Sequence, residues 1–149
     1  MRRSAQAHWS GDLKSGAGSV ATATGTLSNT PYSFHSRFEQ GKSTNPEELL
    51  AAAHAGCFTM AVSAQLANAG LKADSLDTTC SITLEQKDGG FAITESHLEL
   101  KAKIPGATQQ AFDQETQAAK AGCRVSKLFN TNMTLTGSLQ TADTRSSAA

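Results

Sequence analysis

A long uncharged segment at residues 49–71 constrains the fold of this chain more than any other feature. It holds eight alanines and two glycines, and it follows Asn45, Pro46 and Glu48, which suit the cap, first position and first turn of a helix. The pattern predicts one helix over residues 45–68, with Gly70 near its C-terminal end. The segment is long enough to span a bilayer, but its small and polar residues make it weakly hydrophobic. We therefore expect a helix buried in the protein core and no membrane association.

The rest of the chain alternates strand-like and helical patterns. An Asp88-Gly89 pair between two alternating runs favours a hairpin turn. We expect strands over residues 5–9, 19–24, 32–38, 78–86, 91–104 and 133–139, and further helices over residues 108–121 and 125–129. This order predicts an α+β fold in a single domain over residues 1–140, followed by a disordered tail over residues 141–149.

The composition argues against several classes of function. Thirteen basic residues balance 13 acidic ones without clustering, so we expect no nucleic-acid partner. The N-terminus turns polar where an export signal needs an apolar stretch, which favours a cytoplasmic location. The three cysteines would then be reduced, and any pair of them would be redox-active rather than a static disulfide. The chain has neither the His/Cys spacing of a metal site nor a nucleotide-binding glycine motif, so we expect no cofactor.

Cys57 lies inside the predicted central helix, where a cysteine is ordinarily an inert small hydrophobe. A reactive thiol there needs a cation to hold its thiolate, and the nearest candidate upstream is Arg37. Arg37 could equally be a surface cation, and Glu47 could simply favour the helix N-terminus. On one continuous helix, Glu47 and Cys57 would lie about 15 Å apart along the axis. A pocket holding both needs a broken helix, a bridging Arg37 or a Glu47 from a second subunit.

The other candidate residues each allow two interpretations. Cys123 follows a helix predicted to end at Gly122 and precedes Arg124, so it is either an electropositive exchange site or a buried structural cysteine. Cys80 lies in a predicted strand and is interpreted as structural. His54 precedes Cys57 by three residues; we favour a packing histidine over the base of a cysteine hydrolase, because no third, orienting group is visible.

Four motifs in register carry a resemblance to a known family. They are Arg37-Phe38-Glu39, TNPEEL at residues 44–49, AHAGCFTMA at residues 53–61 and AKAGCRVSK at residues 119–127. Together with QAHW at 6–9, DTT at 77–79 and GFAIT at 90–94, they span nearly the whole chain. The sequence resembles the osmotically inducible protein C (OsmC) family, which includes the organic hydroperoxide resistance proteins.

The resemblance implies an intertwined homodimer with an OsmC-like fold that reduces organic hydroperoxides and defends against oxidative or osmotic stress. By position, Cys57 matches the peroxidatic cysteine and Cys123 the resolving cysteine. Arg37 matches the arginine that stabilises the thiolate, and Glu47 the carboxylate that holds it, in cis or in trans. The reductant would be a small or lipoyl-type protein-bound dithiol.

Two positions depart from the family pattern. Arg124 stands where relatives usually have proline, which could change the mobility or pKa of Cys123, and Cys80 is an extra thiol that could compete as a resolver. Apolar residues near the motifs are expected to line the approach to the site: Phe38, Leu50, Phe58, Met60 and Phe129. Two other functions stay open: a redox sensor or small-molecule-binding dimer that does not turn over, and a cysteine hydrolase that does not need Cys123.

Overall fold

The computed structural model describes residues 1–140, so the predicted disordered tail at 141–149 lies outside the described residues. The chain divides into two compact units at Leu49 and Leu50, and each unit is described by itself. That residues 1–140 form a single domain stays a prediction.

The first unit contains a small antiparallel sheet and a short helix. Strands β1 (Ala5–Ser10), β2 (Ala17–Thr22) and β3 (Thr30–Tyr32) pair in that order. The strand predicted over residues 32–38 is wrong beyond Tyr32, because Phe34–Phe38 forms helix α1. The Ser33 hydroxyl accepts a hydrogen bond from the Ser36 amide at 3.1 Å, and the Ser36 hydroxyl accepts one from the Ser33 amide at 2.8 Å. This reciprocal cap starts a helix that strand propensity alone does not reveal.

Helix α2 (Pro46–Asn68) confirms the predicted central helix. The Asn45 side chain accepts a hydrogen bond from the Glu48 amide at 2.7 Å, as a cap should. The Glu48 carboxylate instead accepts from the Thr44 hydroxyl at 2.8 Å, so the expected capping box is not closed. At the other end, Gly70 has a φ of +74°, which terminates the helix at little steric cost.

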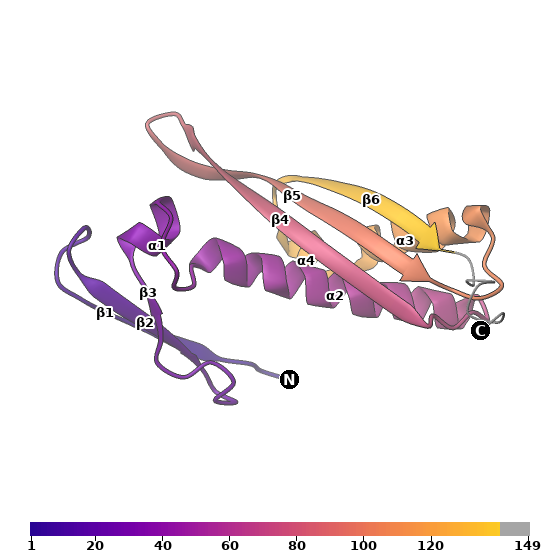
Figure 1. Cartoon of the computed structure of the whole chain (residues 1–149), viewed down its shortest axis with the longest axis horizontal. Helices are drawn as coiled ribbons and strands as arrows, with labels where there is room; N and C mark the ends of the chain where they lie inside the picture. Colours follow the sequence, from indigo (N-terminus) through magenta and orange to yellow (C-terminus); the bar gives the residue numbers. More distant parts are fainter. Residues whose placement is uncertain (141–149) are drawn as a thin grey trace, which may run out of the picture. The chain divides into compact units, whose positions relative to one another are not determined.

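The second unit is built on a mixed sheet in the order β4-β5-β6, along which α2 runs (Figure 1). Strands β4 (Ser75–Lys87) and β5 (Gly90–Lys103) form the predicted hairpin, with positive φ at Asp88 and Gly89. Helices α3 (Gln109–Gly122) and α4 (Arg124–Leu128) then lead to β6 (Asn132–Gln140), which pairs parallel to β5. The predicted α+β class is confirmed.

The core of this unit lies on one face of β5. Its buried residues alternate along the strand: Ser96, Leu98, Leu100 and Ala102. Alternate residues of a strand share a face, and buried residues of both α2 and α3 belong to the same core cluster as the apolar residues of this face. The two helices therefore cover the same side of the sheet. Helix α2 contributes a stripe with a four-residue repeat: His54, Phe58, Val62 and Leu66. The buried central helix is thus confirmed along this stripe.

The opposite side of α2 is exposed in the single chain. Ala52, Ala53 and Gly56 lie there, together with Met60, whose exposed fraction is 77%. By length and composition α2 could cross a membrane, with a mean hydropathy of 1.4, but core helices of soluble proteins pass the same test. The lack of membrane association stays a prediction from composition.

Truncating the buried stripe should destabilise the second unit. Leu66→Ala should lower the free energy of unfolding by about 2–5 kcal/mol, because Leu66 is 1% exposed and its removal leaves a cavity. Leu128→Ala is the matched control: Leu128 is 77% exposed, and the same substitution there should stay within about 0.5 kcal/mol. Urea denaturation followed by circular dichroism measures both, and equal losses would contradict this description of the core.

Candidate functional site

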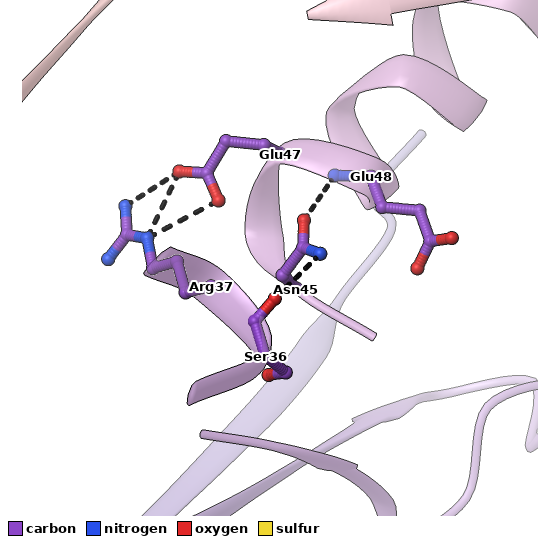
Figure 2. Close-up of polar contacts among 5 residues, drawn as sticks. All are labelled: Ser36, Arg37, Asn45, Glu47 and Glu48. Carbon is purple, nitrogen blue, oxygen red and sulfur yellow. Dashed lines mark hydrogen bonds and ion pairs between the residues drawn. The ribbon is translucent and has the colours of Figure 1, made fainter. Parts of the chain in front are cut away.

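Arg37 and Glu47 form a two-pronged ion pair in the first unit (Figure 2). Arg37 Nε donates to Glu47 Oε1 at 3.0 Å and Oε2 at 3.3 Å, and Nη2 donates to Oε1 at 2.9 Å. Glu47 is 8% exposed, so its charge would be costly to bury without this partner. The third guanidinium nitrogen, Nη1, lies outside the pair. Arg37 is thus oriented by a buried carboxylate, as the sequence resemblance implies.

The pair is held in place by bonds between α1 and the start of α2. Asn45 Nδ2 donates to the Ser36 carbonyl at 3.1 Å, and the Ser36 hydroxyl donates to the Thr44 carbonyl at 2.9 Å (Figure 2 shows the first of these). A Cβ at Gly41 would come within 2.6 Å of the Ser36 Cα, so the connection needs glycine to pass this closely. The cap of α2 therefore also fixes the helix that carries Arg37.

The Cys57 and Cys123 thiols of the second unit lie close enough to shift each other's pKa, although 66 positions (123 − 57) separate them in the sequence. Burial raises the pKa of the Cys57 thiol, but the Cys123 thiol, the backbone amides of Val125 and Arg124 and the Arg124 charge lower it, and the net direction is downward. Burial raises the pKa of Cys123, and the neighbouring Cys57 raises it further. Cys57 is thus the cysteine that ionises first, while Cys123 keeps its proton.

The surroundings of Cys123 differ in part from expectation. Helix α3 ends at Gly122 as predicted, and Cys123 is 1% exposed, which agrees with the alternative of a buried cysteine. Arg124 also acts differently from the expected effect on Cys123, because its amide and its charge bear on the pKa of Cys57. A proline at this position would lack that amide.

His54 is fully buried and bonded on both sides. Its Nδ1 lies 2.6 Å from the Ser96 hydroxyl and its Nε2 lies 2.8 Å from the Ser126 hydroxyl. This supports the interpretation as a hydrogen-bonded packing histidine, since both ring nitrogens are taken up by serines. Cys80 lies in β4 with its sulfur 3.3 Å from the Ser96 hydroxyl, and burial raises the pKa of its thiol.

The structure brings the four predicted site residues together as two pairs, Arg37 with Glu47 and Cys57 with Cys123. Helix α2 is unbroken from Pro46 to Asn68, which removes the broken-helix alternative and leaves a bridging arginine or a second subunit. Sequence reasoning missed the serines around His54. Ser126 could have been noticed three residues after Cys123, at the spacing of a helix cap, whereas nothing in the sequence points to Ser96.

A family model described as OsmC-like protein matches residues 39–137. The chain belongs to the OsmC-like family. Over 135 residues it is 47% identical to peroxiredoxin OsmC of Escherichia coli strain K12, covering 91% of this chain and 94% of that protein. It is also 33% identical over 99 residues to the organic hydroperoxide resistance protein of Xanthomonas axonopodis pv. citri, covering 64% of this chain and 66% of the relative.

Solved structures of OsmC-like proteins share the fold at lower sequence identity. An OsmC-like protein of unknown function from Vibrio cholerae superposes with a TM-score of 0.74 at 17% identity, covering 92% of this chain and 99% of that one. The organic hydroperoxide resistance protein OhrB of Bacillus subtilis superposes with a TM-score of 0.65 at 21% identity, covering 92% and 98%. The predicted family and the OsmC-like fold are confirmed.

Two substitutions at Arg124 should separate the effect of its charge from that of its amide. Arg124→Gln keeps the amide and removes the charge, so the pKa of Cys57 should rise; Arg124→Pro removes both and should raise it further. Proline suits the first position of α4, so the fold should tolerate it. Mass-resolved alkylation of Cys57 as a function of pH measures the Cys57 pKa in wild type and in both variants. Identical profiles for all three proteins would contradict a role for Arg124.

Proposed function

We propose that this protein is a thiol peroxidase that reduces organic hydroperoxides, with Cys57 as the attacking thiolate and Cys123 as the resolving thiol. The observation that carries the proposal is the proximity of two free cysteines, each of which shifts the pKa of the other and in opposite directions. A thiolate is the reactive form of cysteine, and a protonated thiol next to it is placed to close a disulfide. The names of the E. coli and Xanthomonas relatives point to the same chemistry.

The proposed reaction has three balanced steps. The Cys57 thiolate attacks the terminal oxygen of the hydroperoxide; the O–O bond breaks, the alkoxide takes a proton and leaves as the alcohol, and Cys57 becomes a sulfenic acid. Cys123 then attacks the Cys57 sulfur, forming the disulfide and releasing water. An external dithiol, small or protein-bound through a lipoyl group, returns both cysteines to thiols and is itself oxidised. No cofactor is required.

Arg37 is proposed to stabilise the Cys57 thiolate and the leaving alkoxide, and Glu47 to hold Arg37. The two-pronged pair supports this role, because it fixes the guanidinium plane while leaving Nη1 outside the pair. Glu47 can serve its own chain or a partner. The exposed small-residue side of α2 favours a homodimer, since such a face packs closely against a second copy.

A preference for organic over hydrogen peroxide is supported by an apolar hollow in each unit. One, of about 310 Å³, is lined by Leu50, Phe129 and neighbouring residues, and another, of about 250 Å³, places Phe38 and other aromatic rings around Arg37. Two residues expected to line the approach do not belong to these hollows: Phe58 is fully buried in the core, and Met60 is exposed on another surface. We propose that the alkyl or aryl tail of the hydroperoxide occupies such a hollow. We also propose that the protein is cytoplasmic and acts in stress defence.

The first test uses reduced protein and cumene hydroperoxide in single-turnover and dithiol-recycled assays. Wild type should consume the peroxide and form a Cys57–Cys123 disulfide, which mass spectrometry locates. Cys57→Ser should lose consumption, and Cys123→Ser should consume a single equivalent and then stop. Because the pKa of Cys57 is lowered, its oxidation rate should rise with pH and level off below the range of an ordinary thiol.

The alternatives give different results in the same assay. Oxidation of Cys57 without turnover under dithiol would favour the redox sensor. A cysteine hydrolase would be unaffected by Cys123→Ser, and the geometry of His54 does not favour it because both ring nitrogens are bonded to serines. Consumption that does not depend on Cys57 would contradict the proposed function.

The arginine can be tested separately. Arg37→Ala should slow oxidation of Cys57 by about 10²–10³-fold, the usual cost of removing one donor that stabilises developing charge. Arg3→Ala, which removes an exposed arginine of the same unit, is the matched control and should leave the rate unchanged. Stopped-flow measurement of peroxide consumption gives the rate for each variant. Equal rates in Arg37→Ala and Arg3→Ala would show that Arg37 has no part in the mechanism.

A further inference from the structure

A line of buried polar side chains connects two of the cysteines through His54. The His54 ring is fully buried, with Ser96 on its Nδ1 side and Ser126 on its Nε2 side, and these serines are 0% and 2% exposed. Beyond Ser126, the line approaches Cys123, which lies three residues earlier at the start of α4 and whose pKa the Ser126 hydroxyl and amide lower. Beyond Ser96, it reaches the Cys80 sulfur at 3.3 Å. The line thus ends on the resolving cysteine proposed above.

The geometry makes His54 able to exchange a proton at one end of this line. Burial lowers the pKa of His54, so the imidazole is neutral near pH 7 and has one N–H donor and one acceptor nitrogen. If Nδ1–H donates to Ser96, the Nε2 lone pair faces Ser126. The Phe129 ring lies edge-on to the imidazole, with centroids 5.0 Å apart, and covers it with apolar surface.

The groups that face His54 from neighbouring elements carry no formal charge. They are Cys80 on β4, Ser96 on β5, and Ser126 with Phe129 in and after α4, while Cys57 lies three residues further along α2. Cys80 stays protonated at neutral pH, because burial raises its pKa. Burial also lowers the pKa of the His54 imidazole. A proton on His54 would therefore be unstable and readily passed on.

We propose that His54, acting through Ser126, positions Cys123 and takes its proton as Cys123 attacks the oxidised Cys57. The inference rests on the proposed function, since it concerns the second step of that reaction. The Ser126 hydroxyl accepts the Cys123 proton and passes its own to Nε2. The Cys123 electron pair forms the S–S bond and the Cys57 S–O bond breaks. The departing hydroxide takes a proton from solvent to give water, and His54 then releases its proton to solvent and returns to the neutral form. The Cys57 sulfur is reduced and the Cys123 sulfur oxidised, with no other reactant.

A buried resolving cysteine needs such help. Burial and the neighbouring Cys57 both raise the pKa of Cys123, so little of it is thiolate at neutral pH, yet the thiolate is the attacking form. A slow second step leaves the sulfenic acid open to further oxidation by peroxide. His54 is a positioning residue in this account, because it acts on the thiol through Ser126.

The test compares the rate of disulfide closure with the rate of Cys57 oxidation in rapid-quench experiments with one equivalent of cumene hydroperoxide. Ser126→Ala should lower the ratio of closure to oxidation at pH 7 by about tenfold or more. His54→Gln keeps hydrogen-bonding groups but does not accept the proton, and it should do the same. Ser126→Thr restores the hydroxyl and should recover most of the ratio. Ser81→Ala, at an exposed serine of β4, is the matched control.

The pH profile separates proton transfer from packing. The loss of disulfide-closure rate in Ser126→Ala should shrink as pH rises. At high pH, hydroxide ionises Cys123 without the proton relay, that is, without proton transfer through Ser126 to His54. A deficit that is equal at every pH, or an unchanged ratio in Ser126→Ala, would overturn the proposal. If His54→Gln does not fold, the ratios of closure to oxidation in Ser126→Ala and Ser126→Thr test the proposal without it. If it folds and closes as fast as wild type, His54 has no part in the step.

Failure of the peroxidase function itself would be recognised separately, because wild type would then not oxidise Cys57. In that case the relay is measured directly, by titrating the thiolate absorbance of Cys123 in protein carrying Cys57→Ser and Cys80→Ser. Adding Ser126→Ala should raise the pKa of Cys123, since the hydroxyl stabilises the thiolate. An unchanged titration would overturn the relay on this readout.

Discussion

Packing of the α2 stripe on one face of β5 is the interaction on which the second unit depends. The stripe buries Phe58, Val62 and Leu66 against the alternating residues of the strand, and α3 covers the same face. Cys57 precedes Phe58 and lies at the margin of this core, partly buried and in contact with it. A shift of α2 by one residue would rotate the stripe by about 100° and bury polar or small residues instead. The position of Cys57 is therefore set by the apolar packing of its helix.

Burial then determines the chemistry of the thiols. Removing water raises the pKa of any thiol, and Cys80 and Cys123 show this effect. Cys57 departs from them because its burial is offset by the Cys123 thiol and by the backbone amides that begin α4. The difference between two neighbouring cysteines of one core thus comes from their mutual interaction, which lowers the pKa of Cys57 and raises that of Cys123, and from the deeper burial of Cys123. That asymmetry is what the proposed peroxidase mechanism uses.

The polar line through His54 is costly for a core, and it is fully satisfied. A buried imidazole needs a partner at each nitrogen, and β5 and α4 each provide a serine. Among the described residues, no buried side-chain nitrogen or oxygen lacks a hydrogen-bond partner. An aliphatic residue at position 54 would fill the same space without two buried serines. The proposed relay gives the polar line a purpose in the second step of the reaction.

Most secondary structure followed from local signals. The Asn45 cap, the Pro46 start and the alanine-rich run predicted α2 to within a residue, and the Asp88-Gly89 turn predicted the hairpin. These signals act over a few neighbouring residues, so the sequence displays them directly. The prediction was wrong at Phe34–Phe38, where a reciprocal serine cap outweighed the strand propensity of the aromatic residues.

The sequence by itself determined the family, the α+β class and the identity of the four candidate residues, through motifs that each occupy a short stretch of chain. Only the tertiary structure decided that Cys57 and Cys123 lie close enough to shift each other's pKa, that Arg124 acts on Cys57, and that His54 is bonded to Ser96 and Ser126. The physical reason is that pKa values and buried hydrogen bonds depend on desolvation and on groups from distant segments. Ser96 and Ser126 lie 42 and 72 positions beyond His54, and packing alone brings them to its ring.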